Sequence, residues 1–572
     1  MIRPLRQIFT AMRGRISPQE KRFPWLLNYP DSVQWDAEII PRPLPDLLAR
    51  AARDFPTNTA IDFLDYTLTY KELYDQARSM ATGLQLRGLK KGDRVGLFLP
   101  NSPHFVISYY AILLAGGVVV NFNPLYAARD ITHQIRDSGV KIMITFALES
   151  LLGKLEACRD EVSIPTLIVA QFTEALPFPK NWLFPLIKFT EVMPMPAGEG
   201  YISFQDLLAE DRKYLQQADM DPEVDVAVLQ YTGGTTGTPK GAMLTHANLY
   251  TNATQCSLWL TGLEDGNERM LGVLPCFHVF AMTAVMNLSI AKGLTMILHP
   301  QFNLKAVLKD IDKKKPTLMP GVPTIFSAIN QVKNIKKYDL SSLKMCISGG
   351  AGLPRDVRLQ FEANTGCKLV EGYGLSETSP VVAVNPLFGV NKAGSIGMPL
   401  PGTIIEVVGT EKGRRKDKVM AMGETGEICI RGPQVMKGYW NRPDETANTL
   451  RNGRLHTGDV GYMDADGYFF IVDRLKEMII SGGYNIYPRN VEEVLYDHPD
   501  VVEAAVIGVE DEHWGQRVKA FVALKQGSGE SEDTLRAYCK DQLPRFAVPA
   551  TIEFRDELPK TMIGKISKKD LC

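Results

Sequence analysis

Short apolar stretches alternate with helix-like stretches along most of this 572-residue chain, and this alternation constrains the fold more than any other feature. The first run reads as strand, helix, strand, helix and strand, over residues 94–99, 102–114, 117–121, 128–137 and 141–146. Parallel strands need crossover connections of about a dozen residues or more, and a helix usually supplies them. A second run begins after residue 224 and continues to about residue 374. The sequence therefore predicts two similar α/β halves.

The pattern changes beyond residue 393, where short β segments lie between glycines. This predicts a small barrel-like β unit. From residue 475 short strands alternate with helical segments at 490–497 and 532–542, which is typical of a small α+β domain. We therefore expect an α/β N-terminal domain over residues 1–474, with two parallel-sheet subdomains and the β barrel. An α+β C-terminal domain is expected over residues 475–572.

Charge and cysteine content exclude several classes of protein. The 64 basic and 65 acidic side chains nearly cancel, so no nucleic-acid partner is expected. Eight cysteines are scattered without a C-x-x-C motif. This argues against a disulfide scaffold, a zinc ribbon or an iron–sulfur site, and favours a cytoplasmic protein.

Two segments bear on membrane contact. Residues 104–122 carry no charged side chain, but Gly116 and Gly117 divide them into a helix-like and a strand-like half, which favours a buried helix and strand over a membrane span. Residues 1–20 place apolar side chains at helical spacing among arginines. This predicts either a weak amphipathic helix on the inner face of the membrane or a frayed, solvated tail.

Residues 231–241 read YTGGTTGTPKG and follow a strand-like run. Glycines let backbone N–H groups approach an anion, threonine hydroxyls add donors, and a lysine adds positive charge. A Walker A loop is excluded because two residues separate the last glycine from the lysine. The predicted phosphate-binding residues are Thr232, Gly233, Gly234, Thr235, Thr236, Gly237, Thr238 and Lys240.

This loop resembles the phosphate-binding motif of the adenylate-forming superfamily, which includes acyl-CoA synthetases, peptide-synthetase adenylation domains and luciferases. Further motifs occur in the family's order, at residues 347–354, 371–378, 456–459, 473–476 and 559–566. Residues 432–440 and 484–488 also resemble bacterial long-chain fatty-acid CoA ligases. The resemblance covers the chain from about residue 40. It implies an AMP-forming ligase that uses ATP, Mg²⁺ and coenzyme A.

The resemblance assigns a nucleotide site to these motifs. Tyr373 would offer a flat face to adenine, and Asp459 would accept hydrogen bonds from the ribose hydroxyls. Glu377 is a hard oxygen ligand suited to Mg²⁺. Ser376 replaces the family's usual threonine and keeps a hydroxyl. The other implied ATP- or AMP-binding residues are Gly350, Ala351, Glu371, Gly372, Gly374 and Arg474.

The resemblance also assigns catalytic and hinge residues. Lys565 would stabilise charge in the transition state of adenylate formation, and His278 would orient or gate the acyl group. A histidine among apolar residues is also common in a core, so that alternative stays open for His278. Lys476 would be the hinge of a mobile C-terminal domain. Gly482, Gly483 and Tyr484 would then line the pantetheine tunnel of coenzyme A.

The resemblance implies that the substrate to be activated is a small-molecule carboxylic acid. No aspartate occupies the segment that binds the substrate amine in amino-acid-activating relatives, and the region expected to form the acyl pocket is apolar. Its expected residues are Trp259, Val279, Phe280, Met282, Val285, Val322, Ile325, Phe326 and Ala351. We expect a medium- to long-chain fatty acid. An aryl or dicarboxylic acid, transfer to a carrier protein, a catalytically inactive lipid-binding protein and a homodimer remain alternatives.

Overall fold

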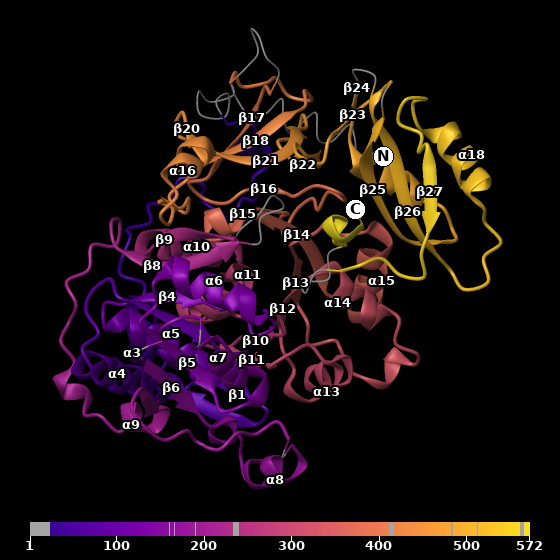
Figure 1. The fold of residues 1–572 in the computed structure, drawn as a ribbon. Helices are drawn as coiled ribbons and strands as arrows, with labels where there is room; N and C mark the ends of the chain where they lie inside the picture. Colours follow the sequence, from indigo (N-terminus) through magenta and orange to yellow (C-terminus); the bar gives the residue numbers. More distant parts are fainter. Residues whose placement is uncertain are drawn as a thin grey trace.

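A computed structural model describes residues 23–159, 161–164, 166–188, 190–232, 239–410, 417–481, 484–511, 513–560 and 566–571. A large N-terminal domain carries a smaller C-terminal domain on one flank (Figure 1). The expected classes, α/β for the large domain and α+β for the small one, are confirmed.

The first sheet of the large domain has the order β19-β9-β8-β4-β3-β5-β6-β7 among the described residues. Its strands are β3 (Arg94–Phe98), β4 (Val118–Asn121), β5 (Ile142–Phe146), β6 (Thr166–Ala170), β7 (Tyr201–Ser203), β8 (Val226–Thr232), β9 (Lys240–Thr245) and β19 (Gly438–Tyr439). The strands from β8 to β7 are parallel, as predicted for β3, β4 and β5. Strands β6 and β7 were not predicted, and β8, expected at the start of the second half, belongs to this first sheet because it pairs with β4. Strand β9 is antiparallel to β8 and was not predicted. The chain therefore forms a hairpin before the next helix begins at His246.

The second sheet has the order β16-β15-β14-β13-β12-β10-β11-β1-β2 in the described part of the chain. Its strands are β1 (Thr59–Phe63), β2 (Tyr66–Thr69), β10 (Arg269–Gly272), β11 (Thr295–Leu298), β12 (Leu318–Gly321), β13 (Met345–Ser348), β14 (Lys368–Gly374), β15 (Val381–Val384) and β16 (Met398–Pro399). The hairpin β1–β2 joins this sheet because β1 pairs with β11 in parallel. The early part of the chain thus completes the second half, which local sequence patterns did not reveal.

Helices pack around both sheets (Figure 1). The helices of the large domain are α3 (Asp46–Asp54), α4 (Tyr70–Leu86), α5 (Pro103–Leu114), α6 (Ala128–Ser138), α7 (Lys154–Cys158), α8 (Lys180–Ile187), α9 (Phe204–Leu208), α10 (His246–Trp259), α11 (Val279–Ala281), α12 (Leu288–Lys292), α13 (Leu304–Lys314), α14 (Pro323–Asn330), α15 (Arg355–Thr365) and α16 (Pro443–Thr449). A π-helical turn over Met282–Asn287 joins α11 to α12.

Helix α5 overlaps residues 104–122, the uncharged segment that is about as long as a membrane span. Ser102 caps it by accepting a hydrogen bond from the N–H of Phe105 at 3.2 Å, and residues 103–113 are buried. The Tyr110 hydroxyl donates to Asn287 at 2.9 Å, which ties α5 to the second half of the domain. The predicted buried helix and strand are confirmed. Within the described ranges, no helix combines the length and apolarity needed to cross a bilayer.

The β unit and the C-terminal domain complete the fold. The β unit is an antiparallel sheet with the strands β17 (Ile404–Val408), β18 (Gly426–Arg431), β20 (Leu450–Arg451), β21 (Arg454–Met463) and β22 (Phe469–Arg474). The C-terminal domain contains β23 (Ile479–Ser481), β24 (Tyr484–Ile486), α17 (Pro488–Tyr496), β25 (Val501–Asp511), β26 (Gly515–Leu524), α18 (Glu532–Gln542) and β27 (Thr551–Phe554).

The two domains have separate hydrophobic cores. The core of the large domain ends at Phe469, with Ile471 packed against it. The core of the small domain begins at Ile479. The chain therefore passes between cores within about eight residues, and we propose a domain boundary at residues 474 and 475, as expected from the sequence.

Candidate active site

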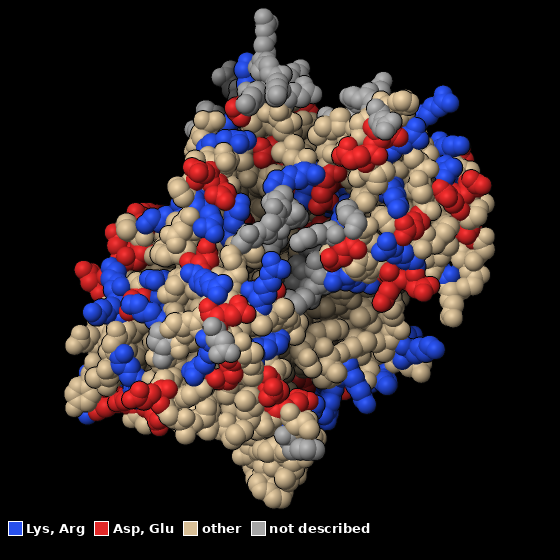
Figure 2. All heavy atoms as spheres, viewed as in Figure 1, with Lys and Arg blue, Asp and Glu red and all other residues tan. Residues whose placement is uncertain are grey.

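A cleft of about 3140 Å³ lies between the two domains. Figure 2 shows this side of the molecule hollowed between them, with basic and acidic side chains around the hollow. The cleft is lined by every predicted site residue for which the structure describes a side chain or glycine backbone: Thr232, Lys240, His278, Gly350, Ala351, Glu371, Gly372, Tyr373, Gly374, Ser376, Glu377, Asp459, Arg474 and Lys476. Residues from distant parts of the sequence thus meet in one cleft.

Some predicted positions lie outside the described residues. These are Gly233, Gly234, Thr235, Thr236, Gly237, Thr238, Gly482, Gly483, Lys565 and the N-terminal residues 1–20. The backbone of Tyr484 belongs to β24, in register with Ser481. The described neighbours of Lys565 that line the cleft are Lys560, Ile566, Ser567 and Lys568.

The phosphate-loop motif connects β8 to β9, because Thr232 and Lys240 are partners in that hairpin. The Lys240 ammonium lies 5.5 Å from the ring centre of Tyr439 and 3.9 Å from the Glu445 carboxylate. The Tyr439 hydroxyl donates to Glu377 Oε1 at 2.7 Å. Tyr439 was not predicted as a site residue, although it lies in the motif at residues 432–440. It places the lysine and the expected metal ligand on the same wall of the cleft.

Strands β13 and β14 form the wall expected to face adenine. Gly350 has a φ of +82°, a conformation that residues with a side chain rarely adopt. A Cβ on Gly374 would lie 2.0 Å from the Pro380 carbonyl oxygen, closer than any real contact. Backbone geometry therefore requires glycine at both positions.

Tyr373, Asp459 and Arg474 form a connected group. The Tyr373 hydroxyl donates to Asp459 Oδ2 at 2.5 Å, and Arg474 Nε lies 3.1 Å from Asp459 Oδ1. Burial raises the pKa of Tyr373 well above its usual value, and the neighbouring Asp459 charge acts in the same direction. The hydroxyl is therefore a donor at neutral pH. Each oxygen of Asp459 already has one protein partner and keeps a lone pair for a further donor.

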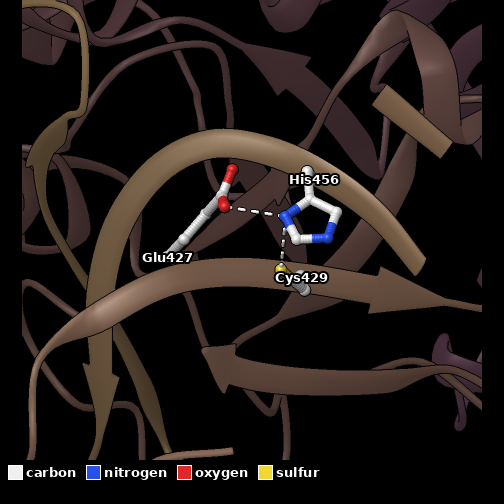
Figure 3. A group of neighbouring side chains, drawn as sticks. All are labelled: Glu427, Cys429 and His456. Carbon is white, nitrogen blue, oxygen red and sulfur yellow. Dashed lines mark hydrogen bonds and ion pairs between the residues drawn. The ribbon is translucent and has the colours of Figure 1, made fainter. Parts of the chain in front are cut away.

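Glu427, Cys429 and His456 form a buried cluster (Figure 3). Distances of 2.7 and 3.4 Å join His456 Nδ1 to Glu427 Oε2 and to Cys429 Sγ. Glu427 Oε1 accepts a hydrogen bond from the Gly458 N–H at 3.1 Å. Arg451 Nη2 lies 3.0 Å from the same His456 Nδ1 and supplies positive charge there. The cluster therefore fixes the turn that carries Asp459. No local sequence pattern indicated this cluster.

Glu371 is a buried carboxyl at the junction of the domains. Burial raises its pKa from 4.5 to about 7, and Arg489 of α17 opposes this shift. Arg489 also lies against the glycine turn that contains Gly350 and Ala351, since a Cβ on Gly352 would come within 2.5 Å of its Nη2. The sequence did not indicate Arg489, because it belongs to the other domain.

Asp473 links the domains at the expected joint. Its carboxylate accepts hydrogen bonds from the Arg474 N–H at 2.7 Å and from the Arg489 N–H, in the first turn of α17, at 2.8 Å. Burial raises its pKa from 3.8 to about 6, although both N–H groups act in the opposite direction. Lys568, near the chain end, lies 3.0 Å from Glu477 and 2.8 Å from Glu492. Charged groups thus connect the joint, α17 and the C-terminal tail.

His278 lies at the start of α11, where its Nδ1 accepts a hydrogen bond from the Phe280 N–H at 3.2 Å. The cleft continues past it along an apolar wall that includes Cys256, Trp259, Leu260, Val279, Phe280, Ala284, Leu288 and Ala351. Burial raises the pKa of the neighbouring Cys276 thiol to about 12, which disfavours a thiolate nucleophile there.

The prediction of the acyl pocket was wrong for part of its residues. Five of the expected residues are buried in the core and do not line the cleft: Met282, Val285, Val322, Ile325 and Phe326. Phe326, for example, packs its ring against Phe361 at 4.9 Å between centroids. Helices α10 and α12 supply wall residues instead. Hydrophobicity alone did not distinguish core side chains from cleft side chains.

This fold and this cleft define the class of adenylate-forming enzymes, in which a large α/β domain and a small α+β domain enclose a nucleotide site. Residues 48–440 match the family model described as AMP-binding enzyme, and residues 490–565 match that of the AMP-binding enzyme C-terminal domain. The chain belongs to the AMP-binding enzyme family.

Relatives extend over nearly the whole chain. It is 46% identical to a long-chain-fatty-acid–CoA ligase of Bacillus subtilis (strain 168), over 96% of this chain and 97% of the relative. It is 37% identical to a long-chain-fatty-acid–CoA ligase of Escherichia coli O157:H7 with the same coverage. The structure is similar to the anthranilate CoA ligase AuaEII in complex with anthranoyl-AMP. The TM-score is 0.81 at 27% identity, over 93% of this chain and 97% of that one.

Proposed function

We propose that this protein is an AMP-forming acyl-CoA ligase that activates a medium- to long-chain fatty acid. The carboxylate attacks the α-phosphate of ATP, which gives an acyl-adenylate and pyrophosphate. The thiol of coenzyme A then attacks the acyl carbon, which gives an acyl-CoA and AMP. The curated relatives with this activity cover 96% of the chain and support the proposal.

One observation carries the proposal. A single cleft is lined both by the charged groups of Lys240 and Glu377 and by apolar side chains of α10 and α12, and His278 is among the residues that line it. Acyl activation needs this combination, because the acid must place its carboxylate at the phosphates and its chain away from water.

We assign the nucleotide contacts to the polar residues of the cleft. The hairpin β8–β9 presents the phosphate loop, Tyr373 and the glycines around it face adenine, and Asp459 accepts from the ribose. Arg474 neutralises part of the charge at Asp459, from which it lies 3.1 Å. Glu427 acts through the turn before Asp459 and is a positioning residue.

Mg²⁺ fits Glu377. Its Oε1 accepts from Tyr439, and both residues line the cleft beside Lys240, so an oxygen ligand faces the place where phosphates would lie. When bound, Mg²⁺ would neutralise charge on the phosphate oxygens.

Lys565 is proposed as the transition-state lysine. Residues on both sides of it, Lys560 and Ile566, line the cleft, which supports a place for this segment near the reacting groups. A fatty carboxylate is already ionised at neutral pH, so no general base is needed, and positioning plus charge stabilisation suffices. Rotation of the C-terminal domain about Lys476 would then bring Gly482, Gly483 and Tyr484 to the pantetheine arm.

The Lys565→Ala variant tests whether Lys565 acts in adenylate formation and not in thioester formation. It should abolish adenylate formation, measured as ATP–pyrophosphate exchange, and keep thioester formation from supplied acyl-adenylate. Normal exchange in the variant would contradict the assignment of Lys565. Release of ADP in place of AMP by the wild-type enzyme would contradict the reaction itself.

Acid specificity is tested by exchange with acids of increasing length. Each buried methylene should lower KM about fourfold until the pocket is filled. Preference for an aryl or dicarboxylic acid would support those alternatives. Thioester formation with a carrier protein and none with free coenzyme A would identify a carrier-linked enzyme.

We propose a cytoplasmic enzyme that contacts the inner face of the membrane through residues 1–20. Deletion of these residues should reduce co-sedimentation with anionic liposomes, and unchanged binding would contradict this contact. Sedimentation velocity tests the homodimer, which would have twice the chain mass of 63.6 kDa.

A further inference from the structure

Helix α8 projects from the end of the large domain opposite the β unit (Figure 1). No residue of this eight-residue helix is buried. The same projection is a tip without charged side chains at its end in the space-filling view (Figure 2). The tip is far from the cleft between the domains, and none of its residues lines that cleft.

The exposed apolar side chains of this tip are Phe178 (83%), Trp182 (67%), Leu183 (38%), Leu186 (62%) and Ile187 (71%). Residues 182–187 are apolar without interruption. A helix that is apolar on all sides is normally buried in a core or a membrane. Here the protein covers little of it, so the side chains need a partner outside the chain.

Contacts with the rest of the domain hold one side of α8 in place, so the orientation of its exposed side is defined. Phe184 points inward and packs against Phe172, with 4.9 Å between ring centroids. Lys180 Nζ donates to the Leu64 carbonyl at 2.8 Å and to Asp65 at 2.5 Å. These contacts fix which side chains face outward.

The chemistry of the tip fits a lipid surface. Lys180 and Lys188 flank the apolar run, and each is paired with a carboxylate, Asp65 and Glu191 respectively, so the exposed apolar side chains carry the interaction. Tryptophan is enriched at membrane interfaces, and exposed Trp182 lies on this tip. At about 12 Å, the helix is too short to span a bilayer but long enough to lie in the headgroup region.

A protein partner fits less well. A stable protein–protein interface takes about 20 to 30 residues from each partner, whereas this tip offers five exposed apolar side chains. We propose that Phe178 and α8 form an interfacial anchor that inserts into the headgroup region of a lipid bilayer.

This anchor would hold the enzyme where a long-chain acid is most concentrated, since such acids partition into lipid. On that point the inference rests on the proposed function. Vesicle binding itself needs neither ATP nor acid, so it can be measured independently. A lack of ligase activity would leave the anchor intact, and a lack of binding would leave the ligase intact.

The test uses the full chain and sucrose-loaded vesicles of equal parts phosphatidylcholine and phosphatidylglycerol. The double variant Trp182→Ser/Leu186→Ser should lower the vesicle partition coefficient about tenfold or more. Its activity with a short, water-soluble acid should stay unchanged, which shows that it is folded. The matched control Trp514→Ser/Leu359→Ser removes an exposed tryptophan and leucine at 48% and 44% exposure elsewhere, and should bind like wild type.

A second measurement locates the insertion. Lipids brominated on the acyl chain should quench tryptophan fluorescence in the wild type, and Trp182→Phe should lose that quenching while still binding. The proposal is overturned if wild type does not pellet with vesicles, or if removal of residues 1–22 abolishes binding that the α8 variant retains. It is also overturned if the α8 variant changes the sedimenting mass and not the vesicle binding, which would identify a second copy as the partner.

Discussion

Replacing Glu371 with glutamine should stabilise the protein above neutral pH. Glu371 is 7% exposed, and burial moves its pKa from 4.5 to about 7. Because the folded pKa is the higher one, the folded state binds the proton more tightly than the unfolded state does. The stability that this group contributes is therefore complete below pH 4.5 and is lost as the pH rises through 7.

The size of the effect follows from the shift in the pKa of Glu371. At about 1.4 kcal/mol per pH unit, the wild-type protein carries a penalty of roughly 3 kcal/mol at pH 8 that Glu371→Gln removes. Glutamine has nearly the same shape and carries no charge. The variant should therefore unfold a few degrees higher at pH 8, and within about half a kcal/mol of wild type at pH 4.5.

Urea unfolding at pH 4.5, 6, 7 and 8, followed by tryptophan fluorescence, measures this difference. Glu161→Gln is the control, since its side chain is 63% exposed and its removal should change little at any of these values. The reasoning would be refuted if the wild type and Glu371→Gln had parallel pH profiles. It would also be refuted if the variant were the less stable protein at pH 8.

Three further changes test the site. Gly374→Ala should weaken ATP binding about tenfold or more, measured by calorimetry, because its Cβ would meet the Pro380 oxygen at 2.0 Å; Gly529→Ala, with open space around it, should be neutral. Glu427→Gln should raise the KM for ATP about tenfold, because it loosens the turn before Asp459. The control Glu406→Gln, in the same sheet, should leave this KM unchanged. An unchanged KM in Glu427→Gln would contradict the positioning role of Glu427. Lys476→Pro should impair thioester formation more than pyrophosphate exchange, and equal losses in both assays would argue against a hinge.

The strands and helices that repeat locally could be predicted from the sequence. The segment at 102–114 became α5 and the strands around it became β3 and β4, because buried parallel strands and crossover helices follow local composition. The hairpin β1–β2 could not be placed, since its pairing with β11 joins residues more than two hundred positions apart. Strand β9 was hidden because its six residues directly follow the phosphate loop and directly precede a helix.

The residues that line the candidate cleft could be predicted where family motifs contain them. Tyr373 and Asp459 belong to such motifs, and the structure joins them by a hydrogen bond. Tyr439 and Arg489 were missed because their roles depend on which surfaces the folded chain brings together. The residues of the acyl wall were only partly predicted. The sequence pattern around an apolar residue such as Met282 does not show whether its side chain fills a core or lines a cavity.

The separation of the hydrophobic cores within the short stretch from Ile471 to Ile479 has an evolutionary consequence. A recombination event at this stretch would exchange the small domain, to which we assign the pantetheine contacts, and leave the large domain with the apolar wall of the cleft unchanged. Chimeric descendants that join one ancestor's large domain to another's small domain should therefore fold, and under the proposed function they could accept a new thiol without a change in the acyl pocket.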